Sequence, residues 1–146
     1  MPPRRSKGWF TEIRGYRFGA EFSPVSIDAG PYLDRWILYL GFGCLRLHKF
    51  YRGDDNRAPH DHPFSFWTFP LKSYREHVYD ETGFVESRVV RALRVHYRPA
   101  AFRHIVTGRD DWKRGPFWTI VWATRPKRQW GFWPFPKFFV HWKEWV

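Results

Sequence analysis

Phe117-Trp-Thr-Ile-Val-Trp-Ala-Thr124 is the clearest buried strand of this sequence. Eight apolar or β-branched residues follow a Gly-Pro pair, and the run is too short for a typical helix. Aromatic residues make up 22% of the chain, and this composition also favours strands. Both features therefore predict a strand at residues 117–124.

Similar short runs recur on both sides of it, separated by turn signals at intervals of about ten residues. Strands are expected at residues 36–41, 44–51, 74–79 and 104–107, in two runs within 84–98, and around 130–133 and 138–142. Asp80-Glu-Thr-Gly83 indicates a hairpin, because glycine supplies the positive φ of a tight turn. Such a series predicts an all-β sandwich or barrel.

The chain is expected to form a single domain over residues 1–146, a length that suits one hydrophobic core. Residues 36–124 are expected to form the barrel. Residues 1–35 are punctuated by Gly and Pro and are expected to wrap the barrel or pair as short edge strands. Residues 125–146 form a basic, aromatic C-terminal segment, which either packs as core or barrel cover or stacks nucleobases.

The charge of the chain is strongly positive. It has 25 basic and 14 acidic residues, a net charge of +11, which attracts anions such as nucleic acid, nucleotides, phosphorylated sugars or small carboxylates. The alternative is that the charge serves only solubility. Cys44 is the single cysteine, no run of about 20 apolar residues occurs, and the basic start lacks an apolar signal region. We therefore expect a cytoplasmic location.

His60-Asp61-His62 places two imidazoles two residues apart. Along a strand, residues i and i+2 point to the same side, so both rings could share one metal, while Asp61 faces away as a structural partner. His104 follows Pro99 further along the chain. Three histidines with an open position are typical of a catalytic metal site. The alternative is three ordinary hydrogen-bonded histidines.

The runs Gly53-x6-His60-x-His62 and Pro99-x-Ala-x-x-His104 resemble the two short motifs of the cupin superfamily. The resemblance covers roughly residues 44–124. It implies a cupin-type double-stranded β-helix, or jelly-roll, barrel that holds a divalent metal through His60, His62 and His104. Two positions depart from the motif: the family's glutamate ligand falls at Phe66 or Trp67, and its following glycine falls at Ser73.

A three-histidine site without the carboxylate is similar to that of the thiol dioxygenase branch of the cupins, of which cysteine dioxygenase is an example. This resemblance implies Fe(II) and a reaction of dioxygen with a small anionic substrate. Zinc, manganese or nickel, and isomerase or hydrolase chemistry, stay open. Residues 60–76 and 128–132 also resemble small cupin-like proteins of bacteria and phages, and that resemblance implies a fold without an activity.

Glu76 is the remaining candidate for a role in catalysis. It lies on the strand expected after the histidine pair. If that strand lies beside the histidines, Glu76 could ligate the metal, tune it, or act as general base to a bound water. The alternative is a solvated carboxylate beside Arg75 or His77.

Several arginines flank the predicted site. Guanidinium groups bind carboxylate or phosphate through a bidentate fork, so these side chains could orient an anionic substrate. They are Arg57, Arg98, Arg103, Arg125 and Arg128. Among the other histidines, His48 and His96 either line the pocket as functional groups or make only structural hydrogen bonds there. His77 and His141 are expected at the surface or in packing.

Three functions fit these observations. The first is a metal-dependent cupin, a non-haem iron oxidoreductase of the dioxygenase type. The second is a non-catalytic cupin that binds a nucleotide or another small anion. The third is a nucleic-acid-binding protein that uses the barrel as a scaffold. A homo-oligomer is compatible with each of them.

Overall fold

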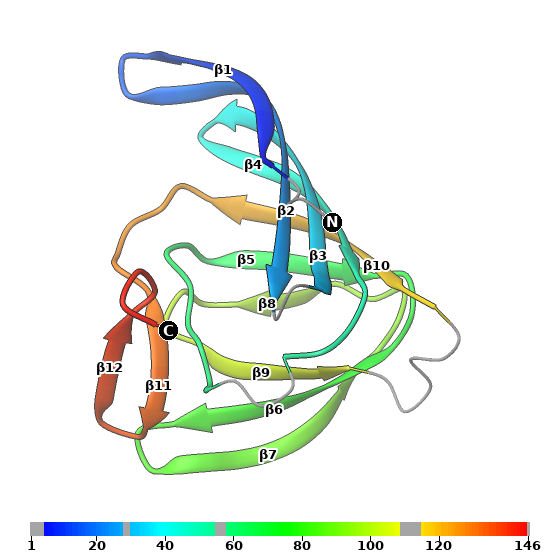
Figure 1. Ribbon diagram of the computed structural model, residues 1–146, viewed down its shortest axis with the longest axis vertical. Coiled ribbons are helices and arrows are strands. Elements are labelled where there is room, and N and C mark those ends of the chain that lie inside the picture. The colour runs from blue at the N-terminus through cyan, green and yellow to red at the C-terminus, as the bar shows by residue number, and fades with distance from the viewer. Residues whose placement is uncertain (1–4, 28–29, 55–57, 109–114, 146) are drawn as a thin grey trace.

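The computed structural model describes residues 5–27, 30–54, 58–108 and 115–145. These residues are all-β, as the sequence predicts (Figure 1). Their strands are β1 (Lys7–Ile13), β2 (Tyr16–Ile27), β3 (Gly30–Gly41), β4 (Gly43–Phe50), β5 (Phe66–Pro70), β6 (Tyr74–Asp80), β7 (Gly83–Val90), β8 (His96–Arg98), β9 (Arg103–Gly108), β10 (Phe117–Thr124), β11 (Gly131–Phe135) and β12 (Phe138–His141). None of these ranges contains a helix long and apolar enough to cross a membrane.

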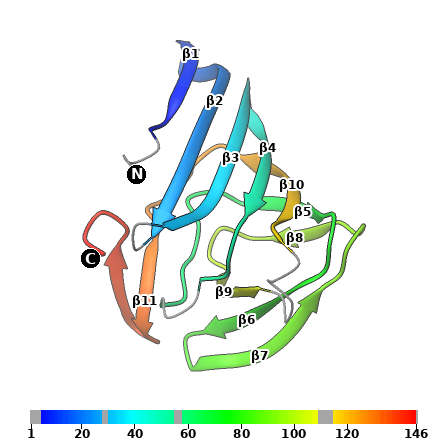
Figure 2. The same cartoon turned by 45° about the vertical axis from the view of Figure 1, so that its right-hand side comes forward.

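The strands form two main sheets and a hairpin. The large sheet has the order β1-β2-β3-β4-β10-β5-β8, the small sheet has the order β7-β6-β9, and β11 pairs with β12. The large sheet curves, so that β2 and β3 stand steeply across β5 and β10, while the small sheet closes the lower side (Figures 1 and 2). The two sheets therefore face each other around an interior.

Strand β10 occupies the centre of this arrangement. It pairs antiparallel with β4 along its whole length and with β5 on its other side. Phe117 is fully buried, and its ring stacks on Phe50 at 4.8 Å and on Tyr74 at 5.2 Å between centroids. Because Tyr74 belongs to the small sheet, this stack of rings joins the two sheets.

The N-terminal segment contains an edge strand, β1, as one of the two expectations has it, together with a long strand that lies inside the sheet. Strand β2 is long and lies inside the large sheet, between β1 and β3. Gly15, one of the glycines that punctuate this segment, lies in the turn of the β1–β2 hairpin. Arg14 and Gly15 both have positive φ, 51° and 79°, at the turn between β1 and β2, which is the backbone geometry of a tight two-residue hairpin turn.

The large sheet has an unusual polarity. On β4, Arg46 and His48 line the interior, whereas Leu45 and Leu47 point outward and are 41% and 36% exposed. The outward neighbours across the sheet are also apolar: Leu38 pairs with Leu45, Leu45 with Trp122, and Trp122 with Trp67. The interior of the barrel is therefore partly polar, which is the arrangement of a binding cavity rather than of a solid core.

Phe117 should be essential for stability. Replacing Phe117 with Ala removes a fully buried ring from the junction of the sheets and should lower the free energy of unfolding by about 3–5 kcal/mol. Denaturant unfolding measures this loss. As the control, Phe135→Ala changes a side chain that is 68% exposed and should shift stability by about 0.5 kcal/mol or less. Equal losses in the two variants would contradict the central position of Phe117.

Candidate metal centre

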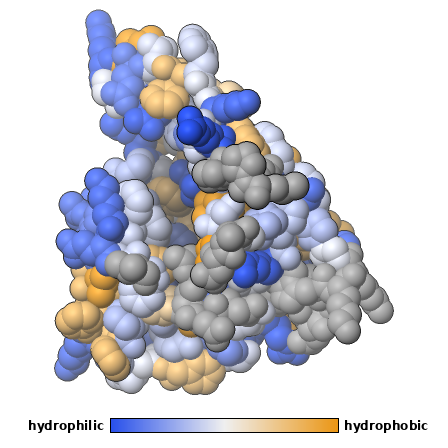
Figure 3. All heavy atoms as spheres, in the orientation of Figure 1, coloured by the Kyte–Doolittle hydropathy of each residue, from blue (hydrophilic) through white to orange (hydrophobic). Residues whose placement is uncertain are grey.

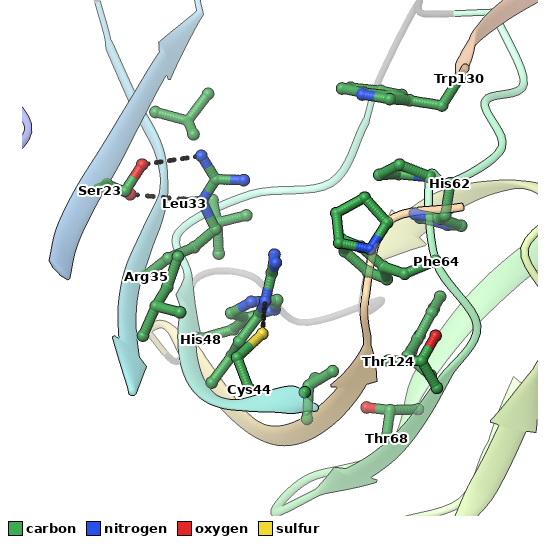
Figure 4. A pocket seen from close by; sticks show the side chains of 18 of the residues that line it. Ser23, Leu33, Arg35, Cys44, His48, His62, Phe64, Thr68, Thr124 and Trp130 are labelled. Atoms are coloured by element: carbon green, nitrogen blue, oxygen red, sulfur yellow. Dashed lines mark hydrogen bonds between the residues drawn. The ribbon is translucent and has the colours of Figure 1, made fainter. Parts of the chain in front are cut away.

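A large cavity occupies the interior of the barrel. It has a volume of about 990 Å³ and is lined by inward-facing residues of β2 to β5 and β10, together with His60, His62 and His104. Figure 3 shows the face of the molecule hollowed below the β1–β2 hairpin. In Figure 4, Arg35 and His48 stand on one side of this space, and His62, Phe64 and Trp130 stand on the other.

Backbone pairing brings the three histidines together. The amide of each of His60 and His104 donates to the carbonyl of the other at 3.1 Å, and the amide of His62 donates to the carbonyl of Ala100 at 3.0 Å. The histidine pair forms only isolated bridges and not a full strand, but the alternation of side chains still holds. His60 and His62 consequently point the same way, towards His104.

The three rings converge on one point. Their centroids are 4.9–5.1 Å apart, the Nε2 atoms of His62 and His104 are 3.0 Å apart, and one nitrogen from each ring lies within 4.8 Å of the others. Burial, and then the charges of His60 and His104, hold the pKa of His62 well below its ordinary value. A neutral imidazole is the form that ligates a metal, so this cluster could hold a metal ion.

Glu76 lies behind the cluster, not in the cavity. Its side chain is completely buried, and its Oε2 accepts a hydrogen bond from Nδ1 of His104 at 2.8 Å. Its Oε1 accepts from Arg88 at 2.8 Å and from Arg98 at 2.5 Å. With Nδ1 occupied in this way, His104 presents Nε2 to the other two rings. Among the roles predicted for Glu76, this geometry favours orienting and tuning a ligand.

The environment of Glu76 also fixes its charge. Burial alone would raise the pKa of this carboxyl, but the hydrogen bond and charge of His104, with the contacts from Arg98 and Arg88, outweigh it and lower the pKa to about 2. Glu76 is therefore a carboxylate at neutral pH, with both oxygens engaged. A general base would need a pKa closer to the working pH.

Two aspartates support the histidine segment. Oδ2 of Asp54 lies 3.7 Å from Nδ1 of His60. Asp61 faces away from the cluster, as the strand alternation predicts, and accepts hydrogen bonds from the Gly131 amide at 2.9 Å and the Trp133 indole at 3.1 Å. These bonds anchor the C-terminal hairpin against the metal-site segment.

An aromatic ring occupies the position of the missing carboxylate ligand. Phe66 is buried, and its ring packs edge-on against His62 with 4.8 Å between centroids. Phe64 also lies beside His62, at 6.2 Å. His62 therefore borders apolar surface within the cavity wall.

Two of the arginines predicted to contact substrate are instead bound to buried carboxylates. Arg98 is bound to Glu76, and Arg128 forms an ion pair with Asp61 at 2.8 Å. Arg57 lies outside the described residues. A role in substrate binding stays a prediction for all three, but Arg98 and Arg128 already have partners of opposite charge.

The remaining two arginines donate to backbone carbonyls. Arg103 is bonded to the carbonyls of Asp80 and Pro136, at 3.3 and 2.9 Å. Arg125 donates to the carbonyl of Gly15 at 2.8 Å and lines the cavity. Of the four described arginines in the predicted set, Arg125 is thus the one that borders the cavity.

Sequence reasoning missed the arginines in the cavity wall. Arg35 on β3 and Arg46 on β4 line the cavity together with His48. A signal was present, because residues 44–50 alternate Cys, Arg, His and Phe against Leu, Leu and Lys. Alternation alone does not reveal which face of a strand is inward. The usual assumption that Leu faces the core would place Arg46 on the outer face of the sheet.

The fold has clear relatives among solved structures. No protein-family model matches the chain, and no curated protein sequence matches it. The structure of Fe(II)-HppE with the alternative substrate (S)-1-HPP superposes with a TM-score of 0.57 at 11% identity, over 71% of this chain and 55% of that one. Hydroxypropylphosphonic acid epoxidase from S. wedmorenis gives 0.53 at 11% identity, over 70% and 55%.

A third similar structure is the E162A mutant of Bacillus subtilis oxalate decarboxylase OxdC. Its TM-score is 0.54 at 17% identity, over 75% of this chain and 29% of that one. The chain thus spans 55% of the length of each of these two epoxidase chains and 29% of the length of the decarboxylase chain. At these identities the likeness concerns architecture, and it shows that the chain has the cupin-type jelly-roll fold that the two motifs predict.

Glu76 should control metal affinity without touching the metal. Glu76→Gln removes the negative charge that accepts the Nδ1 hydrogen of His104 and should weaken metal binding roughly 10–100-fold. Competition titration with a metal-sensitive dye measures the affinity, and circular dichroism checks the fold. Glu81→Gln, at an exposed turn, should leave the affinity unchanged. An unaltered affinity in folded Glu76→Gln would refute the tuning role.

Proposed function

We propose that this chain is a metal-dependent enzyme of the cupin fold, in which His60, His62 and His104 hold a divalent metal at the wall of the cavity. The observation that carries the proposal is the convergence of one ring nitrogen from each histidine within 4.8 Å, at a cavity of about 990 Å³. Among the described residues this cluster offers three nitrogen donors and no carboxylate, and such a set leaves coordination positions open for other molecules.

Iron is the metal that we propose. Imidazole suits iron, zinc, copper and nickel alike, and the similar HppE structure is described as an Fe(II) protein. Fe(II) with open positions supplies dioxygen activation when bound. The proposed activity is accordingly that of an oxidoreductase of the dioxygenase type, acting on a small anionic molecule drawn in by the positive charge of the chain.

The protein's own residues have distinct tasks in this proposal. Glu76 holds the Nδ1 hydrogen of His104 and so fixes the orientation of that ring. Phe66 packs against His62 and keeps water from the side where other cupins carry a carboxylate. The cavity beyond the rings binds the substrate, and its size admits a small organic molecule.

A second candidate function is capture of a small anion without turnover. The observation that favours it is the polar cavity wall, in which Arg35, Arg46 and His48 face the same space as the histidine cluster. The two functions differ in one measurable respect. Consumption of dioxygen by the Fe(II)-loaded protein with small organic acids supports the enzyme, and anion binding without consumption supports the capture module.

Metal binding should depend on each of the three histidines. His60→Ala, His62→Ala and His104→Ala should each lose stoichiometric metal, because two imidazoles hold a divalent ion far less tightly than three. Elemental analysis after anaerobic loading with Fe(II) and gel filtration measures the content. His77→Ala and His141→Ala, outside the cluster, should retain the metal. Full metal content in folded His62→Ala would contradict the proposed metal site.

A further inference from the structure

A polar row crosses the inner face of the large sheet, opposite the metal cluster. Ser23 on β2 pairs with Arg35 on β3, Arg35 with His48 on β4, and His48 with Thr119 on β10. All four residues line the cavity. Arg46 lies in the next inward row, paired with Val121. Pleating therefore directs two guanidinium groups and an imidazole into one enclosed space.

These two arginines lack partners of opposite charge. Arg35 is half-buried and donates to the hydroxyl of Ser23 at 2.9 Å and to its carbonyl at 3.4 Å. Arg46 is also half-buried, and its Nε contacts the sulfur of Cys44 at 3.1 Å. Throughout the described ranges, neither guanidinium forms an ion pair. Burying an unpaired charge is costly, so a negative group at this wall would stabilise two guanidinium groups that have no counter-charge among the described residues.

One acidic side chain of this wall, Glu21, already accepts a hydrogen bond. Glu21 lines the cavity, but its Oε2 accepts a hydrogen bond from the hydroxyl of Tyr39 at 2.8 Å. The two guanidinium groups repel each other, since burial and then the charge of Arg46 lower the pKa of Arg35. A bound anion would relieve both the desolvation and the repulsion.

His48 supplies a third polar group at the same place. Its Nε2 is buried and has no hydrogen-bond partner in the structure. Burial, and then the charges of Arg46 and Arg35, hold the pKa of His48 well below its ordinary value, so the ring is neutral. A buried polar nitrogen without a partner, beside two unpaired guanidinium groups, indicates a ligand that completes the set.

Contacts through one aromatic ring link this polar wall to the metal cluster. The guanidinium carbon of Arg46 lies 4.3 Å from the centroid of Phe64, and the ring of Phe64 lies beside His62. A single small molecule could therefore contact Arg46 at one end and the histidine cluster at the other.

We propose that Arg35 and Arg46, assisted by His48, bind the oxyanion group of a small organic acid whose other end faces the three-histidine cluster. The oxyanion is a carboxylate or a phosphoryl group, because both present the coplanar oxygens that match a guanidinium fork. The assignment of the other end rests on the proposed function. The oxyanion subsite itself rests only on the residues of the cavity wall and needs no metal.

Calorimetric titration of the metal-free protein with inorganic phosphate and with malonate tests this subsite. Arg35→Gln and Arg46→Gln should each weaken binding of the preferred anion at least tenfold. Arg35→Lys and Arg46→Lys keep the charge and lose the fork, so they should give smaller but clear losses. Arg94→Gln removes an exposed arginine and should leave the affinity unchanged. Thermal unfolding of each variant, with and without the anion, separates lost binding from lost folding.

The outcomes for subsite and metal are separable. His62→Ala should lose metal yet bind the anion as tightly as the unchanged protein, and the arginine variants should keep the metal. Preference for phosphate over malonate, or the reverse, identifies the acidic group. The subsite is overturned if neither anion binds, or if folded Arg35→Gln and Arg46→Gln bind as Arg94→Gln does. Loss of metal binding with unchanged anion binding would leave the proposed oxyanion subsite supported.

Discussion

A single buried carboxylate connects the main parts of this structure. Glu76, on the small sheet, binds Arg98 at the edge of the large sheet, Arg88 on β7 and His104 on β9. Removing one partner from such a buried set leaves an uncompensated charge, at a cost of about 3–5 kcal/mol. The same bond that fixes the two sheets at this edge also fixes the ring of one proposed metal ligand, so folding and site geometry depend on one group.

The interior of the barrel is divided between packing and binding. One apolar cluster, formed by Ile37, Cys44, Phe66, Val121 and Ala123, lines the inner face of the large sheet, and a second joins this sheet to the small one at Phe117. The cavity borders both clusters, and its polar row from Ser23 to Thr119 occupies sheet surface that apolar side chains could otherwise fill. The aromatic residues compensate, because large rings bury much surface per residue and can seal a thin core.

The sequence predicted those parts of the structure whose signals are local. The β10 strand was visible as an unbroken apolar run, and the three histidines were visible because a spacing of two places both rings of the pair on one side. The cupin-type fold followed from the order of two short motifs. The strand and the histidine pair need only the nearby chain and the period of a strand, whereas the cupin-type fold rested on the resemblance of two motifs to those of the cupin superfamily.

The remaining features depend on pairing between distant strands, which spacing along the chain does not reveal. Arg98 directly precedes the second motif, yet it binds Glu76 on β6, whereas Arg128, which follows β10, binds Asp61 of the first motif. Arg35 and Arg46 lie well before the histidine motifs, yet the register of β3 and β4 turns them into the cavity. Distance along the chain from a motif therefore does not by itself indicate which arginines line the cavity.

The polarity of β4 is inverted relative to a strand whose inner face is apolar. A strand that turns Leu45 and Leu47 outward and Arg46 and His48 inward reverses the usual burial of apolar side chains. Such a reversal costs stability unless the inward charges meet partners, and none of the acidic groups in the described part of the chain forms an ion pair with Arg46. In a chain with a net charge of +11, most arginines serve the surface. An arginine held inside a barrel against this cost marks the position at which the fold departs from packing to accommodate a ligand.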